Sequence, residues 1–117
     1  MSRLPRTFTP AELAVITRVL DMANASTPER LQEARSVLVS EMDDGGMGSL
    51  KVVRNGADPR RFGCILGEAS ARDSDGVPVF ITVIADQFDK LYEIDIWKTD
   101  FSRLAAMPEP ETLVTAK

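Results

Sequence analysis

The sequence lacks histidine altogether and has a single cysteine, Cys64, among its 117 residues. Histidine is the commonest general base and the commonest zinc ligand, so its absence removes the usual donor for both roles. One cysteine can form neither an intrachain disulfide nor a cysteine-rich metal site. Because no histidine can activate its thiol and it lies in an apolar stretch, Cys64 is expected to be a core residue. A lone thiol suits a reducing compartment, so we expect a cytoplasmic protein.

Long apolar runs and an excess of basic charge are also missing. No apolar run approaches the roughly 18 residues that a membrane-spanning helix needs, and the N-terminus lacks the apolar core of a signal peptide. Fourteen basic residues against eighteen acidic ones give a net charge of −4. Proteins that bind nucleic acid normally present a basic patch, so we expect neither a nucleic-acid nor a membrane partner. The acidic balance is compatible with a basic protein partner.

What the sequence does contain is the composition of a soluble globular protein, 44% hydrophobic and 27% charged. A chain of this length is expected to form one domain whose core needs no disulfide. We place that domain at 9–104, after an N-terminal arm at 1–8. Beyond Met107 the chain has two prolines and few large apolar residues, so 105–117 is expected to be a loose tail.

Two helix starts carry the same signal, a threonine followed by a proline. Thr9 can cap a helix, the proline after it suits the first helical position, and Glu12 completes a capping box. Apolar residues then recur at helical spacing, which predicts a helix over about 10–24. The second signal, at Thr27, predicts a short helix that ends at about residue 33 or 34.

Five segments predict strands, although the first is ambiguous. Helical spacing could continue through 36–42, but its valines and the glycines beyond it favour a strand. Gly63 and Gly67 predict a bulge or close packing over the third strand. Short loops between successive strands require antiparallel pairing. The sequence therefore predicts an α+β fold, a five-stranded antiparallel meander with two N-terminal helices on one face. The predicted strands cover residues 36–42, 50–54, 60–70, 77–85 and 91–101.

The last of these strands has two unlike faces. Side chains alternate along a strand, so one set should face the core and the other should not. The core set is Tyr92, Ile94 and Ile96. The other set carries two carboxylates and the only tryptophan of the chain. Its members are Leu91, Glu93, Asp95 and Trp97.

Two long motifs stand out, the turn segment 42–50 (MDDGGMGSL) and the strand segment 91–101 (LYEIDIWKTDF). Together they resemble the signature of a bacterial family of domains of unknown function, and a turn at 75–79 fits between them. The likeness covers roughly residues 10–104. The resemblance implies a small single-domain fold and carries no assigned chemistry. A second likeness, of class and charge only, is to the immunity proteins of bacterial toxin systems.

Acidic residues concentrate in the C-terminal half of the chain. Between residues 62 and 101 there are eight acids and three bases, a more negative balance than that of the whole chain. An acidic surface attracts a basic partner and speeds its encounter. We therefore predict an immunity protein with no catalysis and no cofactor, which occludes the active site of a basic bacterial toxin, with a nuclease as the favoured target. The predicted partner-binding residues are Asp43, Asp44, Met47, Asp73, Asp75, Glu93, Asp95 and Trp97.

Other interpretations of these residues remain open. The acids could be solvated or turn-forming, and Trp97 could cover the edge of the core. The two aspartates of the 42–50 turn, with Glu93 and Asp95, could also bind Mg²⁺, which makes a small metal-dependent hydrolase the alternative function. Lys98, the one base on the last strand, should point to the opposite face, which weakens that alternative.

Two glycine-containing turns favour local structure over ligand binding. The turn 73–76 (DSDG) resembles the start of a calcium loop, but Ile84 occupies the position of the required glutamate. The segment 45–48 (GGMG) lacks the lysine and helix that follow a phosphate loop, so a hairpin turn is predicted. A third possible function, a subunit of a homo-oligomer, predicts an apolar patch at an exposed sheet edge.

Overall fold

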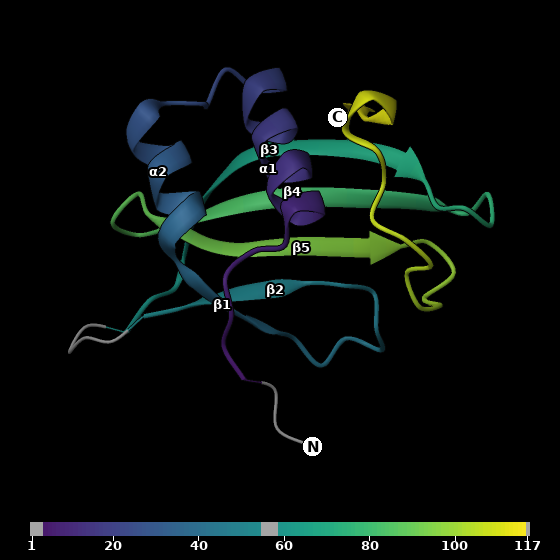
Figure 1. Ribbon diagram of the computed structural model, residues 1–117, viewed down its shortest axis with the longest axis horizontal. Helices are drawn as coiled ribbons and strands as arrows, with labels where there is room; N and C mark the ends of the chain where they lie inside the picture. The colour runs from purple at the N-terminus through teal and green to yellow at the C-terminus, as the bar shows by residue number, and fades with distance from the viewer. Residues whose placement is uncertain (1–3, 55–58, 117) are drawn as a thin grey trace.

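The computed structural model describes residues 4–54 and 59–116, which form an α+β domain. Its strands make one antiparallel sheet, and both helices lie across one face of that sheet (Figure 1). The α+β class and the antiparallel sheet are confirmed, but the sheet has six strands instead of five. In chain order the elements are α1 (Pro10–Met22), α2 (Pro28–Ser36), β1 (Leu38–Glu41), β2 (Leu50–Val53), β3 (Phe62–Arg72), β4 (Pro78–Asp86), β5 (Leu91–Lys98), a 3₁₀ helix (Pro110–Thr112) and β6 (Val114–Thr115).

The threonine-proline signals start both helices where the sequence predicts. The Thr9 hydroxyl accepts the N–H of Glu12 at 3.1 Å, and the Glu12 carboxylate accepts the N–H of Thr9 at 2.9 Å, so the capping box is confirmed. Thr27 caps α2 through its side chain. α2 runs to Ser36, slightly beyond its predicted end, and the chain then enters β1, which confirms the strand interpretation of 36–42. Within the described part of the chain, neither helix has the length and apolar character needed to cross a membrane.

The strand order, β1-β2-β5-β4-β3-β6, is not that of a meander. β1 and β2 form the predicted hairpin, and β3, β4 and β5 form a three-stranded meander, but β2 pairs with β5 instead of β3. The eight-residue link 54–61 permits this arrangement. At roughly 3.3 Å per residue it can cross the three strand spacings, of roughly 4.8 Å each, that separate β2 from β3. The meander prediction was wrong because pairing between strands that are neighbours in sequence is only a tendency.

The C-terminal segment, expected to be a loose tail, is tied to the sheet. Leu113 is 3% exposed and belongs to the core, and the next two residues form β6 against β3. This pairing places Val114 opposite Ser70, and the N–H of Ala116 donates to the carbonyl of Glu68 at 3.2 Å. Leu113 and the short strand after it therefore help to anchor a segment whose average composition did not indicate any contact with the sheet.

The core lies between the helices and the sheet. Gly67 of β3 allows α1 to approach, since a Cβ at this position would lie 2.9 Å from the Cβ of Ala23 and 3.0 Å from the carbonyl oxygen of Val19. Close packing over Gly67 is thus confirmed, and β3 also has two register shifts, at Phe62/Cys64 and Ile65/Gly67. The buried residues that α1 contributes are Val15, Ile16, Val19 and Leu20.

Cys64 is exposed, so its prediction as a core residue was wrong. It lies between the two register shifts of β3, and the first four residues of this strand are all exposed. The prediction assumed that an apolar strand is covered along its whole length. The beginning of β3 shows that an apolar stretch near a bulge can extend beyond the covered part of a sheet.

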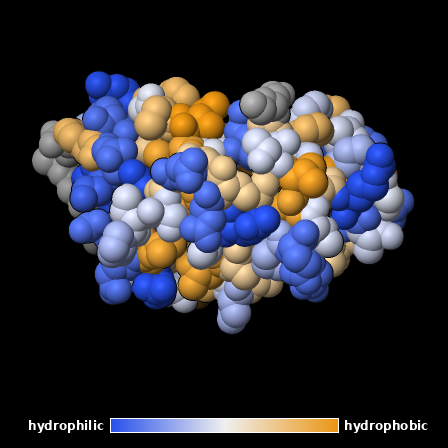
Figure 2. Space-filling model, turned by 90° about the horizontal axis from the view of Figure 1, so that it is seen from above, coloured by the Kyte–Doolittle hydropathy of each residue, from blue (hydrophilic) through white to orange (hydrophobic). Residues whose placement is uncertain are grey.

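The C-terminal segment covers the same face of the sheet as the helices. Leu104, Met107 and Leu113 pack into the core together with residues of α1 and α2, and in Figure 1 this segment crosses the sheet beside α1. None of the described residues forms a layer on the opposite face, which we call the open face. A view turned by 90° shows hydrophobic residues in separate patches between hydrophilic ones (Figure 2).

Candidate functional site

The open face carries the side chains that alternate with core residues along the central strands. On β4, Val79, Ile81 and Val83 belong to the core, so the residues between them point to the open face. On β5 the core residues Ile94 and Ile96 define the two faces in the same way. Cross-strand partners share a face, which extends the assignment to β3. The central open-face residues are Glu68 and Ser70 of β3, Phe80, Thr82 and Ile84 of β4, and Glu93, Asp95 and Trp97 of β5.

Three aromatic side chains gather at one end of the open face and form what we call the aromatic cluster: Phe80, Trp97 and Phe101. Phe80 lies opposite Trp97 in the β4–β5 pairing, and their rings stack with centroids 5.6 Å apart. The Phe101 ring lies 6.2 Å from that of Trp97 in a tilted arrangement. Trp97 is 45% exposed and Phe101 67% exposed, so the cluster presents aromatic surface to its surroundings.

Three carboxylates lie beside this cluster and form what we call the acidic row: Glu68, Glu93 and Asp95. Thr82 lies between Asp95 and Glu68 in the strand register, and its hydroxyl donates to the Glu68 carboxylate at 3.4 Å. Burial and the adjacent Asp95 carboxyl raise the pKa of Glu93, while the Lys51 ammonium opposes this rise. Asp95 pairs with no basic side chain of residues 4–54 or 59–116. The fold therefore leaves negative charge on the open face.

The alternation predicted for β5 holds from Glu93 onward and fails at its beginning. Leu91 is buried in the core, and Tyr92 lies beside Lys51, whose ammonium is 5.7 Å from the ring centroid. The reason is a register shift, because consecutive residues of β4 pair with Glu93 and Leu91 and leave Tyr92 without a partner. Such a bulge reverses the direction of the side chains before it. The predicted positions of Leu91 and Tyr92 were therefore wrong.

Asp73 and Asp75, predicted to bind a partner, form an internal ion-pair cluster with Lys98. Lys98 is 1% exposed, and its Nζ donates to Asp73 Oδ2 at 2.9 Å and to Asp75 Oδ2 at 2.5 Å. A third bond runs to the carbonyl of Arg103 at 3.0 Å. Lys98 points away from the open face, as its strand position predicts. The two aspartates thus hold the turn before β4 to the end of β5.

Hydrogen bonds fix the charge states of this cluster. Burial alone would raise the pKa of Asp73, but the N–H of Ala105 and the ammonium of Lys98 lower it to about 2. The two carboxylates in turn raise the pKa of Lys98. Asp73 is buried and accepts the N–H of Ala105 at 2.7 Å, so it also ties the C-terminal segment to the sheet. Its role is structural.

The glycine-rich segment 45–48 is a turn, as predicted, and its three glycines have φ between 76° and 102°. The Asp44 carboxylate closes it by accepting the N–H of Met47 at 3.1 Å and that of Ser49 at 2.9 Å. Burial would raise the pKa of Asp44, but these hydrogen bonds lower it. The Met47 sulfur accepts the N–H of Lys98 at 3.4 Å. Asp44 and Met47 are therefore held in internal contacts.

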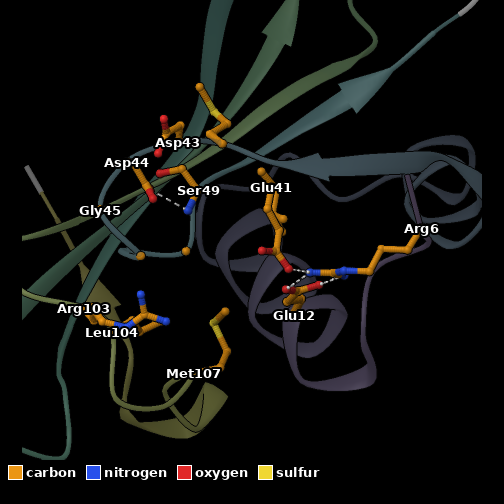
Figure 3. Close-up of a pocket in the computed structure, with 14 residues that line it drawn as sticks. Arg6, Glu12, Glu41, Asp43, Asp44, Gly45, Ser49, Arg103, Leu104 and Met107 are labelled. Atoms are coloured by element: carbon orange, nitrogen blue, oxygen red, sulfur yellow. Dashed lines mark hydrogen bonds and ion pairs between the residues drawn. The ribbon is translucent and has the colours of Figure 1, made fainter. Parts of the chain in front are cut away.

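A hollow of about 420 Å³ lies beside this turn, between the N-terminal arm and the C-terminal segment (Figure 3). The Arg6 guanidinium pairs with both carboxylate oxygens of Glu12, at 2.8 and 2.9 Å, and reaches Glu41 at 3.5 Å. Asp43 and Arg103 also line the hollow. Because acidic and basic groups are mixed and largely paired around it, the hollow offers no surface of one charge.

The carboxylates considered for a metal site do not come together. The two aspartates of the 42–50 turn line the hollow, whereas Glu93 and Asp95 lie on the open face. In the part of the chain that the structure describes, no group of three or more His, Cys, Asp or Glu side chains is placed to hold a metal ion. The open face, with its acidic row and exposed aromatic cluster, is therefore the candidate site.

Three residues of this site escaped the sequence analysis. Phe80 could have been found from the strand register, since it lies opposite Trp97. Glu68 required the register of β3 against β4, which places it opposite Thr82. Phe101 is the last residue of the 91–101 motif, but no local pattern showed that a backbone φ of 62° would place its ring beside Trp97.

Fold and site together define a small α+β domain in which one face of an antiparallel sheet is covered and the other is open. The chain belongs to the family described as Domain of unknown function (DUF6984), which matches residues 5–108. This match contains both segments singled out above, 42–50 and 91–101. No curated protein and no solved structure matches the chain.

Proposed function

We propose that this protein inhibits a basic protein partner by binding it through the open face, without catalysing a reaction. The observation that carries the proposal is the position of Trp97. The only tryptophan of the chain is 45% exposed on the open face, two residues after Asp95 on the same strand. Tryptophan is enriched among the residues that dominate binding energy, and charged neighbours select and steer the partner.

The favoured partner is a bacterial toxin with nuclease activity, and the protein acts as its cytoplasmic immunity protein. A nuclease holds the phosphates of its substrate with lysines and arginines. The acidic row pairs with such cations and so occludes the active site, while the aromatic cluster supplies apolar contact area. The net charge of −4 supports this choice, because it favours encounter with a basic protein.

The open face uses only part of the predicted residue set. Three predicted residues lie on it and are retained: Glu93, Asp95 and Trp97. Four others are engaged in internal contacts and are set aside: Asp44, Met47, Asp73 and Asp75. Asp43 lines the hollow. Glu68, which the sequence did not single out, takes their place in the proposal.

A second candidate, self-association through a sheet edge, is favoured by one observation. Phe62 and Ile65 at the start of β3 are 57% and 49% exposed, and β6 pairs with Ala69 and Ser70 farther along the strand. The register shifts in this part of β3 argue against it, because bulges discourage pairing between edges. Sedimentation velocity tests this candidate. A dimer that dissociates when Ile65→Lys is introduced would support self-association, and a wild-type monomer at high protein concentration would exclude it.

Growth protection tests the proposed function. The protein encoded by the reading frame next to the gene is used as the toxin, and it is expressed in bacteria that also express this chain. We expect protection by the wild type and by Glu111→Lys, which changes an exposed charge on the covered side. The double variant Asp95→Lys/Trp97→Ala should not protect. Full protection by the folded double variant would contradict the proposal.

A further inference from the structure

Phe101 has a backbone conformation that costs the folded protein stability. Its φ is 62°, in the left-handed region that disfavours every residue with a Cβ and suits glycine. Its N–H closes a turn on the carbonyl of Lys98 at 2.8 Å, which a glycine would do equally well. The ring is 67% exposed, so little of it is buried in compensation. What the strained position achieves is to hold an exposed aromatic ring beside Trp97.

We propose that the aromatic cluster and Asp95 together bind an arginine side chain of the basic partner, with the guanidinium on the exposed part of Trp97 and Phe101 flanking it. This inference rests on the proposed function, since it names the group by which the open face recognises a basic protein. Phe101 is thereby a binding residue that was not among the predicted partner-binding residues.

Trp97 and Asp95 lie on the same face of one strand, where a single arginine side chain can contact both. One side of Trp97 is occupied by Phe80, at 5.6 Å and an interplanar angle of 27°, which fixes the indole and leaves its exposed part for the partner. Asp95 is two residues earlier on the same face, at a spacing of roughly 7 Å along the strand. An arginine can lie flat on an aromatic ring and donate two parallel hydrogen bonds to a carboxylate at the same time.

The charges around the cluster favour a cation at this place. Glu93 and Glu68 flank Asp95, one along the strand and one across the sheet. The Lys51 ammonium, which opposes them, lies over Tyr92 on the far side of Glu93. Lysine would satisfy the charge, but its compact ammonium can neither stack nor bind bidentately. The face therefore selects arginine over lysine.

Fluorescence of Trp97, the only tryptophan, gives a direct test. The probe is a nine-residue peptide of alternating arginine and glycine, titrated at low salt. We expect saturable binding that is about fivefold weaker for the matching lysine peptide and undetectable for the citrulline peptide, which keeps the shape without the charge. Equal binding of the arginine and citrulline peptides would overturn the inference.

Two variants test whether Asp95 and Phe101 bind the arginine side chain. Asp95→Asn should weaken binding of the arginine peptide about tenfold, because a charged hydrogen bond is lost. Phe101→Gly should weaken it about fivefold, while the melting temperature stays the same or rises because the backbone strain is removed. The control is Phe88→Ala, which removes an exposed ring that packs against Arg60 outside the cluster and should leave binding unchanged. Wild-type affinity in either Asp95→Asn or Phe101→Gly would exclude the arginine site.

These outcomes separate the inference from the proposed function. If growth protection fails but the peptide binds as described, the toxin is the wrong partner and the arginine site stands. If the wild type protects and Phe101→Gly protects equally at limiting expression, the proposed function stands and the arginine site falls.

Discussion

At the scale of single residues, acidic side chains in this protein lie in two different environments. Asp44 and Asp73 are buried or partly buried, accept several backbone N–H groups, and have lowered pKa values. Glu93 and Asp95 lie side by side on the open face, and the pKa of Glu93 is raised. A carboxylate satisfied by the fold is stabilised in its charged form, whereas adjacent unpaired carboxylates disfavour it. The lowered pKa values of Asp44 and Asp73 thus reflect charges that the fold satisfies, whereas the raised pKa of Glu93 reflects burial and the carboxyl beside it.

Removing Asp73 should destabilise the protein strongly. Asp73→Ala leaves the buried Lys98 with one carboxylate fewer and deprives Ala105 of its acceptor, so we expect a loss of about 3 kcal/mol in the free energy of unfolding. Asp75→Ala is the matched control, since Asp75 is more exposed and its loss should cost about 1 kcal/mol. Urea unfolding measures both, and equal effects would show that Asp73 has no special structural role.

The stability of the protein should fall in acid through the same residue. The pKa of Asp73 is about 2 in the folded protein and near 3.8 when unfolded, so the folded state binds the proton less tightly. Its stabilisation is complete above about pH 4 and is lost as the pH falls toward 2. In Asp73→Asn the fall in unfolding free energy across this window should be shallower. Urea unfolding at a series of pH values tests this, and identical slopes would rule out the assigned pKa.

Turning to the elements, local signals were predictable and distant pairings were not. The capping box of α1 and the turn 45–48 depend on residues within five positions of each other, and both were predicted as local structure, although Asp44, which closes the turn, was predicted to bind a partner. The pairing of β2 with β5 and the bond from Lys98 to Asp73 join residues far apart in sequence, which no local pattern encodes. β5 shows the limit of periodicity, because one bulge at Tyr92 reversed the predicted direction of the residues before Glu93.

The C-terminal segment gives a prediction at this scale. Leu113→Ala removes a buried side chain and should cost about 3 kcal/mol in unfolding free energy. Its neighbour Val114 is 59% exposed, so Val114→Ala should cost roughly 0.5 kcal/mol or less. Thermal and urea unfolding compare the two. Wild-type stability in Leu113→Ala would mean that the segment is loose after all.

For the molecule as a whole, the arrangement explains why so small a domain can leave one face of its sheet uncovered. Both helices and the C-terminal segment lie on one side of the sheet, so the core is complete without the open face. Asp95 and Trp97 can therefore serve a partner without being needed for folding. The sequence indicated these two residues by their strand position, but their neighbours Phe80 and Glu68 follow only from the register of β3, β4 and β5.

The most direct test of the central claim is calorimetric titration of the purified partner toxin into the wild type and into the triple variant Glu68→Gln/Glu93→Gln/Asp95→Asn. We predict that wild-type affinity falls as salt is raised, because surface charge attraction is screened. The triple variant should bind at least tenfold more weakly and depend little on salt, with its unfolding free energy preserved. Equal affinity and equal salt dependence in the two proteins would contradict the assignment of binding to the open face.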